Sequence, residues 1–271
     1  MSAAASGQEA RRSGASRRAG RRLWRLGGPI LLALATFLVV WKAIVVVGGY
    51  PVFILPPPET VLARFVAAWA DGTLAPHAGA TLVEIALGFV IGAGAAILTG
   101  YVLARSRLAE RVLSPYIVAA QATPILALAP VLVLWFGPGL GARVVICALI
   151  VFFPIAVATM VGIRAVDTRL LELARSLRAT RRQVLTTLEI PAALPSIFGG
   201  LRVGVTLSVV GAIVAEWAGA DRGLGVLVNL ARGSLFDIPL LFATLLTIAL
   251  IGVVLYVAVL VVEHRLVGTR R

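Results

Sequence analysis

The chain has 271 residues, of which 60% are hydrophobic and 14% are charged, and its formal net charge is +13. A soluble globular domain carries about 25% charged residues, so the composition excludes an ordinary soluble protein and indicates a polytopic membrane protein. The positive charge does not indicate nucleic acid, because the arginines stand in short segments beside apolar runs, where basic residues set membrane orientation.

Residues 1–26 are rich in arginine, serine, alanine and glycine. This composition predicts a disordered, basic cytoplasmic tail whose contacts are anionic lipid headgroups. A cleaved signal peptide is disfavoured, because the apolar run that follows is too long and lacks a small-residue cleavage site. The remainder, 27–271, is expected to be a single transmembrane domain.

Six apolar segments follow the tail, and each is long enough for a helix to cross a hydrocarbon core of about 30 Å. They predict an all-α protein with about six transmembrane helices near 29–48, 80–104, 113–136, 142–163, 193–218 and 238–262. Internal glycine and proline in the middle segments are tolerated in spanning helices when neighbouring helices satisfy the backbone.

Charge asymmetry predicts the orientation of these spans. With the tail inside, the inner segments hold 19 of the 25 arginines and lysines: seven in the tail, three at 105–111, six at 164–182 and three at 265–271. Basic residues accumulate in cytoplasmic segments. We therefore expect a multi-pass protein of the bacterial cytoplasmic membrane with both termini in the cytoplasm.

The longest outer segment, 49–79, predicts a helix lying on the outer leaflet. Apolar side chains recur there at helical spacing, which places them on one face with an aromatic ring at headgroup depth. These residues are Val61, Leu62, Phe65, Val66 and Trp69. A structural role is favoured over a ligand site.

Polar residues inside the spans are candidates for a translocation path, because burying an ionisable group in lipid is costly. Glu216 is a candidate for the outer mouth, and Glu84 is a weaker one; reaching to water is the alternative for both. Gln121 and Thr123 lie beside Pro124 and are also path candidates, with helix–helix hydrogen bonding as the alternative.

The sequence contains no recognisable catalytic constellation. Cys147 is the only cysteine and is expected to be a small buried side chain, and His77 and His264 are far apart, so no metal site is predicted. Lys42 is the only lysine, and its neighbours cannot form the Gly-Lys-Ser/Thr end of a phosphate-binding loop. We infer that the chain is not an enzyme and has no ATP site of its own.

The cytoplasmic segment 164–191 has the most informative pattern. Asp167 or Thr168 is a candidate cap for a helix over 168–178, and Thr180 with Gln183 forms a candidate capping box for a second short helix. Pro191 is expected to end that second helix. The first helix has one apolar face of Leu170, Leu171, Ala174 and Leu177, and the second has one of Val184, Leu185 and Leu188. A solvated connector is the alternative, but it has no need of two apolar faces.

This segment resembles the coupling loop of bacterial ABC importer permeases, whose motif is Glu-Ala-Ala, three residues, Gly, nine residues, then Ile-x-Leu-Pro. Glu172, Ala174 and Pro191 match it at the correct spacing, with Leu188 and Ile190 in the two apolar positions. The chain departs from the motif twice. Leu173 replaces an alanine, and Arg178 replaces the glycine, which bears on the backbone geometry of the turn.

The resemblance extends from about residue 50 to the end of the chain. The chain resembles the permease group whose solutes include nitrate, sulfonates, taurine, pyrimidine precursors of thiamine, and riboflavin-like vitamins. The supporting segments, each short but in the same order, include Leu55-Pro56-Pro57-Pro58, Gln121-Ala122-Thr123-Pro124, Leu134-Trp135-Phe136-Gly137, Phe152-Phe153-Pro154 and Gly223-Leu224-Gly225.

The resemblance implies a type I ABC importer permease fold and a set of partners. These are separate ATPase subunits that bind ATP and Mg, an extracytoplasmic solute-binding protein and a second permease copy, as a homodimer or a heterodimer. The loop would dock on the ATPase, and closure of the ATPase pair would move the permeases between inward-open and outward-open states. The residues implied in coupling are Leu171, Glu172, Ala174, Arg175, Leu177, Arg178, Ala179 and Pro191.

Two questions stay open at this stage. An ion-gradient-driven secondary transporter is the alternative function; it would need acids near the bilayer midplane and an internal repeat, neither of which is evident. The second open question is the identity of the solute, because in this group the binding protein rather than the permease makes most of the selection.

Overall fold

The computed structural model describes residues 28–29 and 31–268, so the predicted tail at 1–26 lies outside the described residues. The described residues are almost entirely helical and include no strand, which confirms the predicted all-α class. They divide into two compact units, Met1–Ala63 and Arg64–Arg271.

The first unit contains an apolar helix, Leu31–Gly48, and the start of α2 (Pro58–Ala70), which confirms the predicted helix in the outer segment. Proline suits the first turn of a helix because its missing N–H would be unsatisfied there anyway, and Glu59 in the same turn favours the helix dipole. Glu59 also forms an exposed ion pair with Lys42. Along α2, Leu62, Val66 and Trp69 are exposed.

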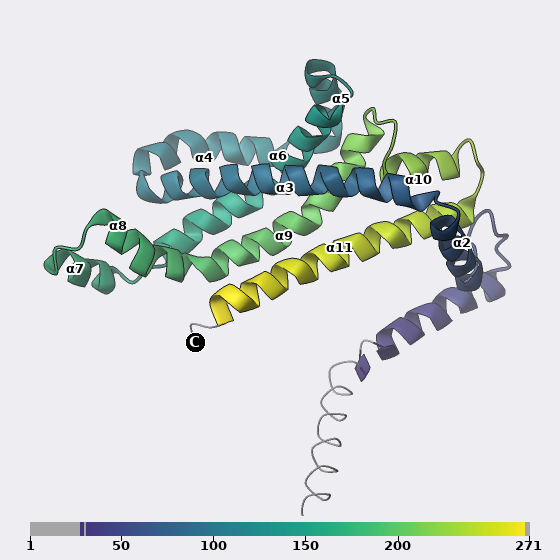
Figure 1. Cartoon of the computed structure of the whole chain (residues 1–271), viewed down its shortest axis with the longest axis horizontal. Helices are drawn as coiled ribbons and strands as arrows, with labels where there is room; N and C mark the ends of the chain where they lie inside the picture. Colours follow the sequence, from purple (N-terminus) through teal and green to yellow (C-terminus); the bar gives the residue numbers. More distant parts are fainter. Residues whose placement is uncertain (1–27, 30, 269–271) are drawn as a thin grey trace, which may run out of the picture. The chain divides into compact units, whose positions relative to one another are not determined.

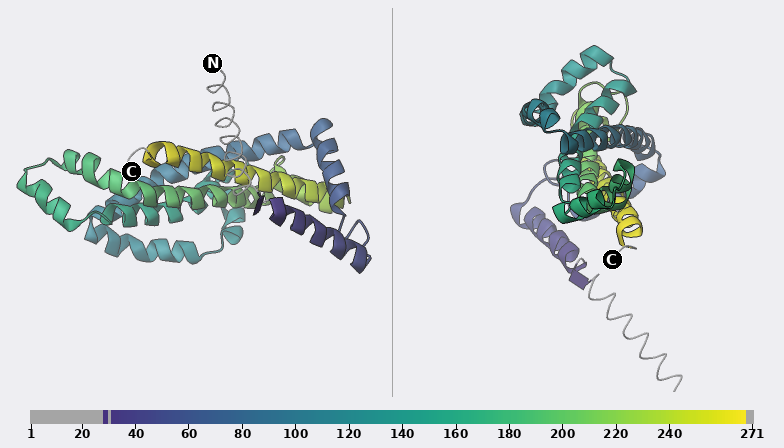
Figure 2. Two further views of the ribbon diagram at one scale, coloured as in Figure 1. Left: turned by 90° about the horizontal axis from the view of Figure 1, so that it is seen from below. Right: turned by 90° about the vertical axis from the view of Figure 1, so that its left-hand side faces the viewer.

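The second unit contains the remaining helices (Figure 1). They are α3 (Leu74–Arg105), α4 (Arg107–Ala122), α5 (Ile125–Phe136), α6 (Leu140–Arg164), α7 (Thr168–Ser176), α8 (Arg181–Val184), the π-helical turn η1 (Leu185–Glu189), α9 (Ile190–Trp217), α10 (Leu224–Arg232) and α11 (Ile238–Val267). In Figures 1 and 2, α3, α6 and α9 run side by side, with α7 and α8 at one end of this bundle and α10 at the other.

Small residues let α6 pack closely between α3 and α9. On α3 they recur every fourth position, at Gly88, Gly92, Ala96 and Gly100. A Cβ atom at position 92 would collide with the backbone of Ala148 on α6. Spanning helices associate by such close backbone approach, because lipid offers no hydrophobic drive for their association. Cys147 is fully buried where α6 meets its neighbours, as expected for a small filling side chain.

One predicted span, 113–136, is wrong as a single helix. The segment consists of α4 and α5, which are bent by 101° relative to each other. Pro124 has no N–H to continue the helix and disfavours helical backbone in the residue before it, and Thr123 is accordingly extended. Among the described residues, five helices are long and apolar enough to cross a membrane, or up to six if the bent pair counts as one span.

The prediction that Pro191 ends its helix is also wrong. The chain stays helical from Arg181 to Trp217, and Pro191 lies at the start of α9. The reason is the wider turn before it, in which the N–H of Ile190 donates to the carbonyl of Leu185, five residues back. A π-helical turn changes the hydrogen-bond register just before the proline, so the helix accommodates the missing donor without breaking.

Candidate functional site

The loop between α6 and α9, residues 165–189, is called the connector from here on. Its two helix starts have the predicted caps. The Asp167 carboxylate accepts a hydrogen bond from the backbone N–H of Arg169, 2.9 Å away. Thr180 and Gln183 form a reciprocal capping box at the start of α8. The connector is therefore an ordered helix–turn–helix element at one end of the bundle (Figure 1).

Arg178 forms the turn between the two helices of the connector. Its φ is 53°, in the left-handed region that favours glycine. The N–H of Arg178 donates to the carbonyl of Arg175, and the N–H of Ala179 donates to the carbonyl of Ala174, both at 2.9 Å. This is the Schellman pattern, in which the left-handed residue lets two orphan carbonyls find partners. Arg178 thus adopts the backbone conformation of the glycine that it replaces in the motif.

The connector presents an apolar surface around a shallow hollow of about 370 Å³. Leu173 and Leu177 line it and are 55% and 73% exposed, and Leu170 is exposed beside them. Ala174 is only 9% exposed, so it packs within the connector. The residues lining the hollow are Leu170, Leu173, Ala174, Leu177, Ala179, Gln183, Val184, Thr187 and Leu188.

The polar residues of the connector are placed for contact with something outside it. Glu172 is exposed and lies in the second turn of α7, so it is not at the helix start where a carboxylate favours the dipole most. Arg175 is exposed on a different side and faces a separate hollow, which Leu171 also lines. The structure therefore separates an apolar side of α7 from a basic one.

Gln121 and Thr123 lie together at the bend between α4 and α5. They line a hollow of about 450 Å³ together with Phe153 and Pro154 of α6. The Thr123 hydroxyl donates to the carbonyl of Ala119 at 3.0 Å. The rest of the lining is apolar, and it includes no charged side chain: Ala120, Pro124, Ile125, Leu149, Ile150 and Leu207.

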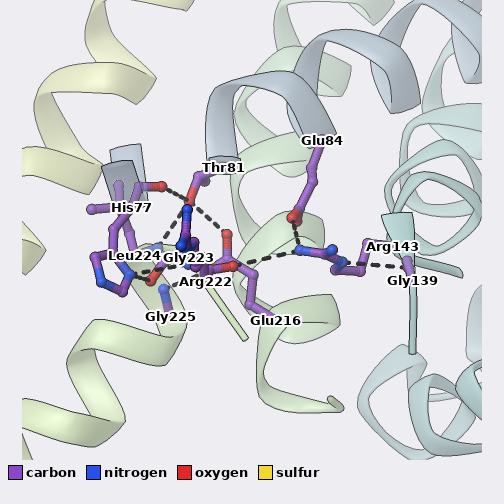
Figure 3. Close-up of polar contacts among 10 residues, drawn as sticks. All are labelled: His77, Thr81, Glu84, Gly139, Arg143, Glu216, Arg222, Gly223, Leu224 and Gly225. Atoms are coloured by element: carbon purple, nitrogen blue, oxygen red, sulfur yellow. Dashed lines mark hydrogen bonds and ion pairs between the residues drawn. The ribbon is translucent and has the colours of Figure 1, made fainter. Parts of the chain in front are cut away.

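Glu216 lies in the last turn of α9, at the end of this helix away from the connector, and is 2% exposed. Its carboxylate accepts hydrogen bonds from the Thr81 hydroxyl on α3 and from the backbone N–H of Gly225, both at 2.5 Å (Figure 3). The second donor belongs to the first turn of α10, where the helix dipole favours a negative charge. Glu216 therefore holds α10 against α3 and α9.

Two glycines make room for this carboxylate. Gly223 has a φ of +148°, and a Cβ atom there would overlap the Glu216 carboxylate. A Cβ atom at Gly225 would also meet it. At position 223 only glycine both adopts this positive φ readily and leaves room for the Glu216 carboxylate.

Glu84 and Arg143 form a buried ion pair that sequence reasoning missed. Glu84 is fully buried on α3, and Arg143 reaches it from the first turn of α6 (Figure 3). Arg143 also donates to the carbonyls of Gly139 and Arg222, at 3.4 and 3.5 Å. Glu84 and Arg143 are 59 positions apart in the sequence, so their pairing can be seen only once the packing of α3 against α6 is known. The sequence signal available was an arginine at an outer span edge opposite an intramembrane acid.

His77 completes this cluster at the α10 end of the bundle. Its Nδ1 lies 3.1 Å from the backbone nitrogen of Gly223 and 2.7 Å from the carbonyl of the same residue. The cluster of His77, Thr81, Glu84, Arg143 and Glu216 thus joins α3, α6, α9 and α10. Among the residues that the structure describes, no group of three or more His, Cys, Asp or Glu side chains could hold a metal ion.

Comparisons with known proteins agree with this arrangement. The family model described as "binding-protein-dependent transport system inner membrane component" matches residues 88–268. The riboflavin transport system permease protein RibX of Chloroflexus aurantiacus is 46% identical over 89% of this chain and 89% of its own length. The formylaminopyrimidine transport permease protein ThiX of Halalkalibacterium halodurans is 34% identical over 86% of this chain and 92% of its own.

The fold has a match among solved structures. The crystal structure of an amino acid ABC transporter with histidines aligns with a TM-score of 0.58 at 22% identity. The alignment covers 76% of this chain and 98% of the solved one.

Proposed function

The chain belongs to the family of binding-protein-dependent transport system inner membrane components, and from this premise we propose that it conducts a neutral, ring-containing vitamin of the riboflavin class. It is a membrane protein, the permease subunit of an ABC importer, and it works with an ATPase on a separate chain and with a solute-binding protein. An ion-gradient-driven carrier, the alternative from sequence, does not fit this family.

The observation that carries the solute class is the 46% identity to a riboflavin permease over nearly the whole chain, against 34% to a formylaminopyrimidine permease. The hollow at the α4–α5 bend supports it. A sulfonate or nitrate anion would call for a cationic group, whereas Gln121, Thr123 and Phe153 offer amide, hydroxyl and aromatic surface. These groups suit a planar, uncharged ring with hydrogen-bonding edges.

The coupling surface is the apolar side of α7. Leu170, Leu173 and Leu177 fill a groove on the ATPase, while Glu172 makes polar contacts at its edge, because these side chains are exposed on an ordered element. Leu171 and Arg175, also named from the sequence, line the hollow on the other side of α7. Ala174, Arg178 and Ala179 act within the connector by fixing its turn, and Pro191 lies in the first turn of α9, where the connector joins that helix. ATP and Mg bind on the partner, and its closure moves the connector as a rigid body.

The family and the distribution of arginines support a proposal for the rest of the assembly. A second copy of this chain forms a homodimer around the solute path, and both termini lie in the cytoplasm, as the distribution of arginines predicts. The connector then faces the cytoplasm, and the cluster around Glu216 faces outward.

Uptake by the complete importer in proteoliposomes tests the solute. We expect ATP-dependent uptake of riboflavin that excess taurine does not inhibit, and a several-fold loss of uptake in Phe153→Leu. Phe152→Leu is a matched control, because Phe152 is the ring neighbour of Phe153 at 5.4 Å but does not line the hollow. Uptake of taurine that riboflavin leaves unchanged would reject the proposed solute class.

A further inference from the structure

A basic hollow lies on the side of the connector away from the exposed leucines. It measures about 630 Å³ and is formed by the C-terminal end of α3, by α7 and by α8. Arg105 of α3, Arg175 of α7 and Arg181 of α8 line it, with Tyr101 beside them. Three guanidinium groups from three separate helices therefore converge on one space.

The charges in this hollow are only partly balanced. Arg105 pairs with Glu189, which is almost fully buried, at 3.1 Å, and its guanidinium lies 5.8 Å from the centre of the Tyr101 ring. Within the described part of the chain, Arg175 and Arg181 have no ion pair, and no acidic side chain lines the hollow. Like charges brought together in this way repel one another, and an anion between them would remove the repulsion.

The surroundings favour a phosphate over a simple carboxylate or halide. Guanidinium groups present rigid pairs of donors that match the oxygens of phosphate, and several of them can share one group. An adjoining hollow of about 660 Å³ shares Arg105 and Leu171 and is lined by more arginines than carboxylates. Its two acids, Glu110 and Glu189, pair with Arg164 and Arg105, whereas Arg107 and Arg111 add positive charge. The whole region is thus a positively charged recess beside the end of a spanning helix, the type of site in which acidic headgroups bind.

We propose that this recess binds a phosphate group, carried either by an anionic lipid or by a soluble cytoplasmic phosphate. The bound group bridges α3 to α7 and α8, so it fixes the connector to the bundle. A lipid reaches the recess along α3, where Leu98 and Val102 are exposed within one turn of Tyr101. This inference does not depend on the identity of the transported solute.

The test uses the full chain assembled with its ATPase subunits, in lipid discs of two compositions. The first arm compares phosphatidylcholine alone with phosphatidylcholine plus phosphatidylglycerol, and counts retained lipids by native mass spectrometry. The second arm adds inorganic phosphate to phosphatidylcholine discs and follows the thermal unfolding midpoint. A lipid source predicts retained phosphatidylglycerol, whereas a soluble source predicts a phosphate-dependent rise in the midpoint.

Charge variants identify the site in either arm. Arg175→Gln with Arg181→Gln is expected to weaken binding about 25-fold, from about 1 kcal/mol or fivefold for each arginine near the surface. Arg175→Lys with Arg181→Lys keeps the charge and should retain most binding, which separates lost charge from misfolding. Arg169→Gln with Arg182→Gln is the matched control, because neither residue lines the recess. Binding in neither arm, or binding that is equal in the first pair and the control pair, would overturn the proposal.

Discussion

Replacing Arg178 by glycine should stabilise the connector. Arg178 has a φ of 53°, and a non-glycine residue in this left-handed region costs about 1–2 kcal/mol. Glycine avoids that cost but loses about 0.5–1 kcal/mol more conformational entropy on folding. The net gain for Arg178→Gly is therefore about 0.5–1 kcal/mol.

Hydrogen exchange at the turn measures this gain directly. The N–H of Ala179 donates to the carbonyl of Ala174, so it exchanges only when the turn opens. A gain of 0.5–1 kcal/mol corresponds to exchange slowed by about two- to fivefold. Arg178→Ala is the control, because alanine keeps the strained conformation and should leave the rate close to that of the parent chain. Equal slowing by alanine and glycine would show that loss of the arginine side chain, rather than relief of backbone strain, is responsible.

Three further predictions concern residues far from the connector. Arg143→Met should lower the free energy of unfolding by about 3–5 kcal/mol, because it leaves buried Glu84 unpaired. Adding Glu84→Leu should recover most of this loss in thermal unfolding. A double variant that is no more stable than Arg143→Met would contradict the pairing. Gly223→Ala should destabilise the protein by more than about 2 kcal/mol, since its Cβ atom overlaps the Glu216 carboxylate at a φ of +148°, whereas Gly79→Ala, in open space, should not. Hydrogen bonds from Thr73, and then from Arg64, lower the pKa of Asp71 below its usual value of 3.8. The turn that they stabilise should be intact above pH 3.8 and loosen as the pH falls below it, seen as a falling protection factor of the Thr73 amide after correction for its intrinsic exchange rate; Asp71→Asn should remove this pH dependence of the protection factor.

Features that depend on nearby residues were predictable from the sequence. The caps at Asp167 and at Thr180 with Gln183 appear as expected, because each involves residues two or three positions apart. The apolar runs gave the helices with boundaries within several residues, since hydrophobic length is a direct requirement of the bilayer.

The two errors both concern proline. The rule that proline breaks a helix predicts a stop at Pro191, and the tolerance of proline in spanning helices predicts an unbroken helix at Pro124. The structure shows the reverse at both positions. At Pro191 a wider turn absorbs the missing donor, and at Pro124 the helix bends sharply instead. The outcome depends on whether neighbouring turns can change their hydrogen-bond register, and single-residue preferences do not contain that information.

The contacts of Glu216, Glu84 and Arg143 could be identified only from the fold. Glu216 was a candidate from its place in a span, but its partners Thr81 and Gly225 come from α3 and α10. The Glu84–Arg143 pair likewise requires the close α3–α6 packing that the small residues permit.

Cross-linking shows whether the apolar side of α7 contacts the ATPase, and the chain suits it because Cys147, its only cysteine, is fully buried. A cysteine introduced by Leu173→Cys is therefore the one accessible thiol of the chain among the described residues, and Leu108→Cys, exposed on α4, is the control. We expect Leu173→Cys to cross-link to a cysteine in the ATPase groove with a yield that changes on ATP binding, and Leu108→Cys to form no cross-link. Labelling of Leu173→Cys by a membrane-impermeant reagent from outside, with no cross-link to the ATPase, would contradict this expectation.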